Sequence, residues 1–102
     1  NLEEGAILPM VRLLENIKDY NIRDIVIASL KSFGESAFLL VLRELERKVS
    51  QEYANIIIDV MTEIESEDII MTQLKNGFNR YSKPVRVVVT DYLKKTHTGS
   101  KL

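Results

Sequence analysis

An internal repeat with a period near 31 residues is the feature that most constrains how this chain can fold. Shifted by 31 positions, residues 5–15 lie on residues 36–46, and residues 22–27 lie on residues 53–58. A period of this size indicates an array of supersecondary units, each of which buries its apolar face against its neighbours. The sequence therefore predicts a stack of similar units built around one shared core.

An offset of 63 residues links the apolar segment that begins near Ile22 to the last apolar segment, which begins near Val85. Under that shift Ile22 and Arg23 lie on Val85 and Arg86. Segments of two kinds alternate along the chain, and one segment of each kind makes a pair. The 102 residues therefore hold about three such pairs of segments. A chain of this length builds one small domain, which we expect to span residues 1–95.

Apolar residues recur within each segment at the spacing of an α-helix. The first segment, for example, carries them at Ile7, Val11 and Leu14, which share one helix face. The same spacing predicts six helices, at about 5–18, 22–33, 36–48, 51–64, 67–78 and 83–95. Two β-branched triplets, at 56–58 and 87–89, favour a strand by propensity. We still predict helix for both triplets because the residues around them keep the helical period.

Capping residues and turn formers lie between these helical segments. The residues expected to cap the second to fifth helices are Asn21, Ser36, Ser50 and Ser66. Gly34 lies where a glycine commonly ends a helix, and Pro84 lies in the first turn of the sixth. Residues 96–102 are expected to form a flexible tail, because their Gly-Ser-Lys-Leu ending resembles either a cloning scar or a natural polar terminus.

The first unit resembles a known repeat family in its sequence from Leu8-Pro9 through Asp19 to Ile22-Arg23-Asp24 and Phe33-Gly34. It looks like the HEAT-like repeat found in phycobilisome lyase subunits, and the resemblance covers about residues 5–95. The match is weaker in the second unit, where Ala54 replaces the arginine, and Arg86 restores the arginine in the third.

This resemblance implies an all-α fold, a right-handed α-α superhelix of about three HEAT-like repeats. It also implies that a turn aspartate and the helix-opening arginines form a structural ladder between repeats. The residues that match these positions are Asp19, Arg23 and Arg86. An anion-binding role for Arg23 is the alternative to this structural one.

Several kinds of catalytic and metal site lack their residues in this sequence. There is no cysteine, which excludes disulfides, thiolate zinc sites and a cysteine nucleophile. His97 is the only histidine, which excludes most histidine-based metal sites and catalytic triads. The acidic stretch 63–68 lacks the glycine and the terminal glutamate of a calcium loop, and an exposed turn is the simpler interpretation. We therefore expect no enzyme activity, no cofactor and no bound metal.

Charge is divided unevenly along the chain although the net charge is −1. Residues 66–102 carry seven basic and three acidic side chains, and residues 35–65 carry three basic and seven acidic ones. The basic end includes Lys75, Arg80, Lys83, Lys94 and Lys95. Three interpretations stay open for this patch: an exposed face in contact with solvent, a contact with an acidic neighbour, and a nucleic-acid site.

The expected function is a protein-interaction or scaffolding segment of a larger protein. Its expected partner-binding ridge consists of Arg12, Leu13, Arg43, Glu44, Arg47 and Gln73. The alternatives are an accessory lyase-like subunit and a nucleic-acid-binding repeat domain that uses the basic end. A cytoplasmic location is expected, because the longest apolar run has six residues, no signal peptide is evident and cysteine is absent.

The sixth helix is expected to lie at an open end of the stack. Its apolar stripe consists of Val85, Val88, Val89, Tyr92 and Leu93, and no seventh helix is predicted to cover it. We therefore expect part of this stripe to pack on the fourth and fifth helices and part to be exposed. Two consequences stay open: a homodimer through the last helix, or further repeats that continue the array in a larger parent protein.

Overall fold

The computed structural model describes the backbone of residues 2–100 and the side chains of residues 5–96. This part of the chain is all-helical and contains no strand. Its elements are α1 (Leu2–Leu13), α2 (Tyr20–Ser32), α3 (Glu35–Glu44), α4 (Gln51–Ile64), α5 (Glu67–Gly77), the short 3-10 helix η1 (Phe78–Arg80) and α6 (Lys83–Ser100). The β-branched triplets 56–58 and 87–89 lie within α4 and α6, which confirms the helical prediction for both.

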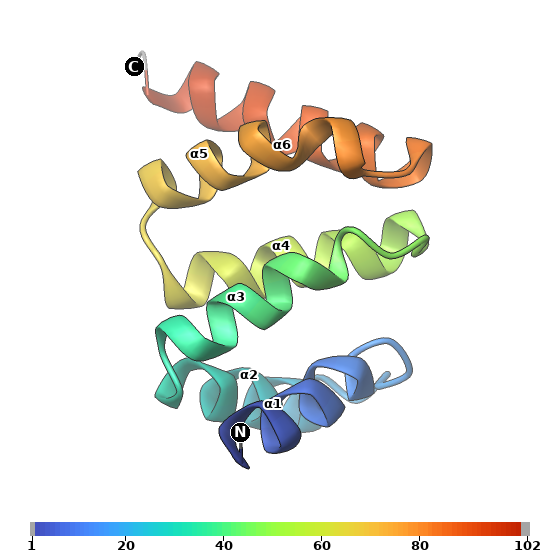
Figure 1. Ribbon diagram of the computed structural model, residues 1–102, viewed down its shortest axis with the longest axis vertical. Helices are drawn as coiled ribbons and strands as arrows, with labels where there is room; N and C mark the ends of the chain where they lie inside the picture. Colours follow the sequence, from blue (N-terminus) through green and yellow to red (C-terminus); the bar gives the residue numbers. More distant parts are fainter. Residues whose placement is uncertain (1, 101–102) are drawn as a thin grey trace.

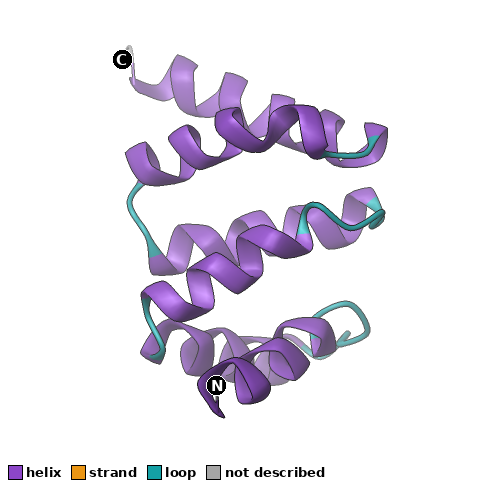
Figure 2. Ribbon diagram, viewed as in Figure 1, coloured by secondary structure: helices purple, strands orange, loops and turns teal. Residues whose placement is uncertain are grey.

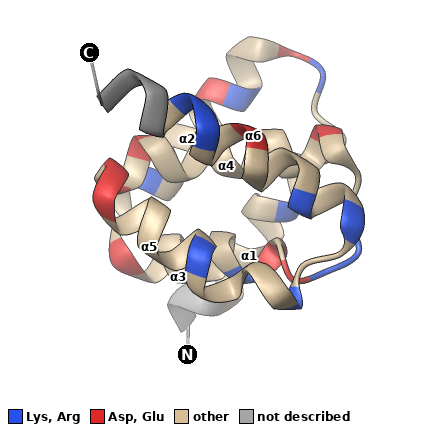
Figure 3. Cartoon of the chain, turned by 90° about the horizontal axis from the view of Figure 1, so that it is seen from above, with Lys and Arg blue, Asp and Glu red and all other residues tan. Residues whose placement is uncertain are grey.

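The six α-helices form three antiparallel pairs, one above another (Figure 1). Short connections join the helices alternately on the right and on the left of the stack in this view (Figure 2). Seen from above, α1, α3 and α5 lie on one side and α2, α4 and α6 lie on the other (Figure 3). Between pairs, α1 packs against α3, α2 against α4, and α4 against both α5 and α6.

The starts of the helices follow local hydrogen bonding. Ser50 caps α4 as predicted, because its hydroxyl accepts the Tyr53 amide at 3.1 Å. The prediction for α2 is wrong, since Asp19 rather than Asn21 is the capping residue and accepts the amide of Asn21 at 2.8 Å. Helix α3 likewise begins after Gly34 rather than at Ser36. Gly34 has a φ of +60°, a conformation that only glycine adopts without strain.

Two helices end earlier than their apolar patterns indicate. After Leu13 and after Glu44 the backbone continues in turns with hydrogen bonds between residues three apart, such as Leu14 to Val11 at 3.1 Å and Leu45 to Leu42 at 3.2 Å. These turns keep Leu14 and Leu45 buried and so extend the helical pattern beyond the helices. Residues 96–100, expected to be a flexible tail, are helical and belong to α6, whereas residues 101 and 102 lie outside the described residues.

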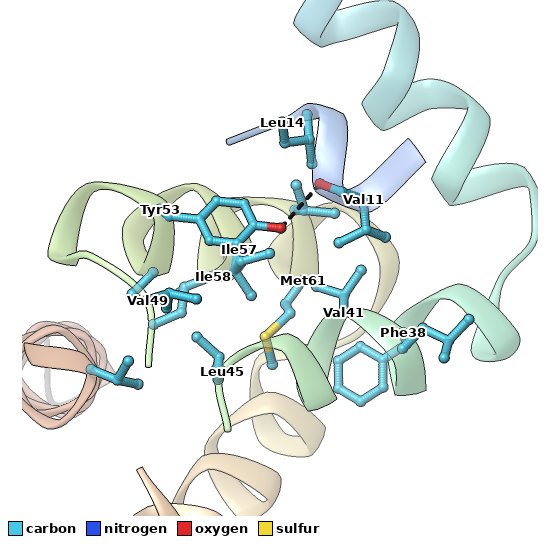
Figure 4. Close-up of a cluster of buried hydrophobic side chains, with 14 of the residues drawn as sticks. Val11, Leu14, Phe38, Val41, Leu45, Val49, Tyr53, Ile57, Ile58 and Met61 are labelled. Carbon is cyan, nitrogen blue, oxygen red and sulfur yellow. Dashed lines mark hydrogen bonds between the residues drawn. The ribbon is translucent and has the colours of Figure 1, made fainter. Parts of the chain in front are cut away.

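The core runs through all three pairs. Figure 4 shows its central part, where side chains of α3 and α4 surround Met61 and the Tyr53 ring reaches toward α1. The α6 stripe belongs to this core, with Val85 and Val89 fully buried and Val88 nearly so. The rest of the stripe, Tyr92 and Leu93, is only partly buried. Helix α6 therefore packs on α4 and α5 with part of its stripe and leaves part at the surface, as predicted.

Candidate partner-binding surfaces

A buried carboxylate links the first two helix pairs. Glu44, the last residue of α3, is only 2% exposed. Its Oε2 atom accepts hydrogen bonds from Arg47 Nη1 at 2.8 Å and from the Tyr53 hydroxyl at 2.9 Å. Its Oε1 atom lies 3.5 Å from Arg12 Nε on α1. Two cations and a phenol thus compensate the desolvation of this carboxylate.

The protonation states in this cluster follow from burial and from the Glu44 charge. Burial raises the pKa of Tyr53 well above 10, and the adjacent Glu44 charge raises it further. The hydrogen bond to Glu44 raises the pKa of Arg47. The phenol is therefore neutral and acts as a donor, and it also lies 3.1 Å from the Val11 carbonyl of α1. The cluster joins α1, α3 and α4.

The structure divides the expected ridge into three parts. Arg12 and Arg47 lie together at the surface, each about half exposed, because both contact Glu44. Glu44 itself is buried and cannot form part of an exposed ridge, so this part of the expectation is corrected. Arg43 is exposed on α3, and Gln73 is partly buried on α5. Among the described side chains, the partners of Glu44 are Arg12, Arg47 and Tyr53, and neither Arg43 nor Gln73 is one of them.

The members of the expected ladder occupy three separate places. Asp19 caps α2, so the expected pairing with Arg23 is wrong. Arg23 lies 3.9 Å from Asp59 of α4 and stacks over the Tyr20 ring at 5.7 Å.

Arg86 contacts its own helix pair rather than a neighbouring one. Its Nη2 atom donates to the Asn79 carbonyl at 3.2 Å, and its guanidinium lies 5.8 Å from the Phe78 ring. Arg23 therefore bridges two pairs, whereas Arg86 stabilises the turn before α6.

A groove of about 770 Å³ lies between α2 and α4. It is lined by Tyr20, Arg23, Asp24, Ile27, Ala28, Lys31, Asp59, Thr62 and Glu63. Desolvation raises the pKa of Asp59, and the Arg23 charge opposes that shift. Its lining includes two basic side chains and three acidic ones, so the groove favours no single sign of ligand charge.

The expected basic patch is not one continuous surface. Arg80 lies 3.2 Å from Glu46 and bridges the second and third pairs. Lys75 and Lys94 instead line a groove of about 410 Å³ between α5 and α6, together with Met71, Phe78, Thr90 and Leu93. Lys83 and Lys95 are exposed elsewhere on α6.

The opposite end of the stack exposes large apolar side chains. Leu13 of α1, a member of the expected ridge, is 54% exposed, and Ile22 and Ile25 of α2 are 50% and 66% exposed. We call these three residues the α1–α2 end face. The sequence did not indicate that Ile22 and Ile25 are exposed, because the same residue types are buried in the other pairs.

Comparison with protein-family models, curated protein sequences and solved structures gives no match for this chain. Within the described residues, no group of three or more carboxylate or histidine side chains could hold a metal ion. None of the helices in this part of the chain is long and apolar enough to cross a membrane. The side chain of His97 lies outside the described residues.

Proposed function

We propose that this chain is a non-catalytic protein-interaction segment built from three HEAT-like helix pairs in a right-handed superhelical stack. It binds another helical element through the end of the stack. The α1–α2 end face carries this proposal, because its residues correspond by the internal repeat to residues that form the contacts between pairs.

The correspondence follows the 31-residue and 63-residue offsets. Ile22 corresponds to Tyr53, which is 1% exposed, and to Val85, which is fully buried. Ile25 corresponds to Val88, which is 5% exposed. In the second pair the counterpart of Ile25 is Ile56, which is partly buried. The helices that carry these positions in the second and third pairs pack on the pair before, through α2·α4 and α4·α6 contacts. The first pair presents the same positions to solvent.

The chemistry of the end face defines its partner. Leu13 corresponds to Glu44, and Ala28 corresponds to Asp59, so the two acidic positions of the second pair are uncharged in the first. In the contact between the first two pairs, Arg12 faces Glu44 and Arg23 faces Asp59. A partner that placed arginines in the same way opposite Leu13 and Ala28 would leave its arginines without a carboxylate. The end face therefore fits an apolar helix pair without arginines at these places.

An extended chain tests this proposal. A copy of residues 35–66 with Arg43 and Arg47 changed to Gln, joined ahead of residue 5, supplies one additional helix pair without those two charges. We expect a single unfolding transition at a higher urea concentration, because Ile22 and Ile25 become buried.

The substitution Ile25→Asp separates docking from simple tethering. In the original chain it should change the free energy of unfolding by less than about 0.5 kcal/mol, as exposed substitutions usually do. In the extended chain it should cost more than about 2 kcal/mol, because a carboxylate is then buried. Equal, small effects in both chains, or two separate transitions, would contradict the proposal.

A further inference from the structure

The groove between α5 and α6 combines an apolar floor with basic flanks. Met71, Phe78 and Leu93 are half-buried side chains at its floor, and Lys75 and Lys94 are exposed on α5 and α6. The groove holds about 410 Å³. The two helices that line it, α5 and α6, form the end of the stack opposite α1 and α2 (Figure 1).

The internal repeat shows what occupies the equivalent surface in the first pair. Under the 63-residue offset, Arg12 corresponds to Lys75 and Arg23 corresponds to Arg86. In the first pair both arginines face carboxylates of the second pair, with Arg12 at 3.5 Å from Glu44 and Arg23 at 3.9 Å from Asp59. The contact between the first and second helix pairs thus contains two ion pairs, and in each of them the arginine belongs to the first pair and the carboxylate to the second.

At the α5–α6 end the corresponding basic residues are present, but no following helix pair supplies carboxylates to them in this part of the chain. Among the described side chains, the ion pairs involve Arg12, Arg23, Arg47 and Arg80, and none involves Lys75, Arg86 or Lys94. The complement of this surface is therefore a helix with apolar residues on one face and carboxylates on the flanks of that face.

We propose that the α5–α6 groove binds an acidic amphipathic helix of a partner protein. The inference rests on the proposed function in naming protein as the partner, but it concerns the other end of the stack. A second copy of this chain fits less well, because its first helix pair has Leu13 and Ala28 where acidic residues are needed. A nucleic acid fits less well too, because Phe78 is the one aromatic side chain among the residues that line the groove and Arg86 already lies over its ring.

Two synthetic peptides test the charge requirement against the full chain. The first has the sequence of residues 51–64, which carries Glu52, Asp59 and Glu63 beside an apolar stripe. The second is identical except for Glu52→Gln, Asp59→Asn and Glu63→Gln. With fluorescence anisotropy as the readout, we expect the acidic peptide to bind at least tenfold more tightly, and its affinity to fall as salt is added.

Substitutions in the chain locate the binding site. Lys75→Glu combined with Lys94→Glu should weaken binding of the acidic peptide at least tenfold. Lys48→Glu, which makes a similar charge change at an exposed lysine between α3 and α4, should leave it unchanged. Circular dichroism verifies that each variant keeps its helices.

Three results would overturn the inference. They are equal binding of the two peptides or none, loss of binding with Lys48→Glu alone, and tighter binding of a single-stranded oligouridylate than of the acidic peptide. The extended-chain experiment concerns the opposite end face, so its failure and a failure here would be distinguishable.

Discussion

The first and third helix pairs carry the same apolar pattern but bury it differently. Ile22 and Ile25 of α2 are 50% and 66% exposed, whereas Val85 and Val88, their counterparts 63 residues later, are 0% and 5% exposed. Both helices form, because the helical period is the same. The neighbouring pair, and not the local pattern, decides which face is buried.

The largest expected effect comes from an aspartate placed at equivalent positions of the third and first helix pairs. Val85→Asp should lower the free energy of unfolding by more than about 3 kcal/mol, because it places a carboxylate in an apolar site. Ile22→Asp, at the exposed equivalent, should change it by less than about 0.5 kcal/mol. Urea denaturation of both variants measures the difference. Similar losses for the two variants would mean that the two end pairs are packed alike.

Alkaline pH should weaken the contacts of two buried tyrosines. Burial raises the pKa of Tyr81 to about 12, and burial together with the Glu44 charge raises the pKa of Tyr53 further. The folded state therefore retains these protons above pH 10, where the unfolded phenols lose them. Stability is fully present below pH 10 and falls by about 1.4 kcal/mol per pH unit for each tyrosine as the pH rises toward 12.

Urea denaturation between pH 8 and pH 11.5 measures this slope. Tyr81→Phe should reduce the slope above pH 10 by about 1.4 kcal/mol per pH unit, because one of the two raised groups is removed. An unchanged slope in Tyr81→Phe would show that this phenol is accessible to water in the folded protein.

The Glu44 cluster joins the first pair to the second, so loss of one of its hydrogen bonds should lower the free energy of unfolding. Tyr53→Phe removes one donor from buried Glu44 and one contact to the Val11 carbonyl, at a cost of about 1–2 kcal/mol. Tyr20→Phe is the matched control, since the Tyr20 side chain is exposed, and it should cost less than about 0.5 kcal/mol. Equal costs for the two hydroxyls, measured by urea denaturation, would remove the cluster as a structural link.

The smallest expected effect concerns the arginines at equivalent positions. Arg23→Ala and Arg86→Ala should each lower the free energy of unfolding by at most about 1 kcal/mol, because the partner of Arg23 is an exposed carboxylate and Arg86 is exposed. A double-mutant cycle between Arg23→Ala and Asp59→Asn should give a coupling below about 0.5 kcal/mol. A coupling above about 2 kcal/mol would mean that this ion pair is buried.

Helix formation and much of the core could be predicted from the sequence. The spacing of Ile7, Val11 and Leu14 predicts their shared burial, and the structure confirms it. Ser50 could be predicted as a cap because capping needs only local sequence. The prediction of Asn21 as a cap was wrong because Asp19, two residues earlier, supplies the carboxylate that accepts the backbone amides.

The surfaces could be predicted only in part, because they depend on which helices become neighbours. Glu44 resembles any other helical glutamate in the sequence, and its burial follows from Tyr53 and Arg12 approaching from two other helices. Part of the α6 stripe packs on α4 and α5, as expected, whereas Tyr92 and Leu93 stay partly exposed. The most exposed leucine and isoleucine side chains, Leu13, Ile22 and Ile25, lie on α1 and α2, where the local pattern is the same as in the buried pairs.

Thiol labelling at equivalent positions tests most directly the claim that neighbours, rather than local pattern, decide burial in this stack. The chain has no cysteine, so Ile25→Cys and Val88→Cys each provide a single reporter thiol. In the folded protein, a disulfide reagent should label Cys at position 25 at close to the rate found in urea, and at position 88 at least a hundredfold more slowly. Similar labelling rates at the two positions would contradict the account.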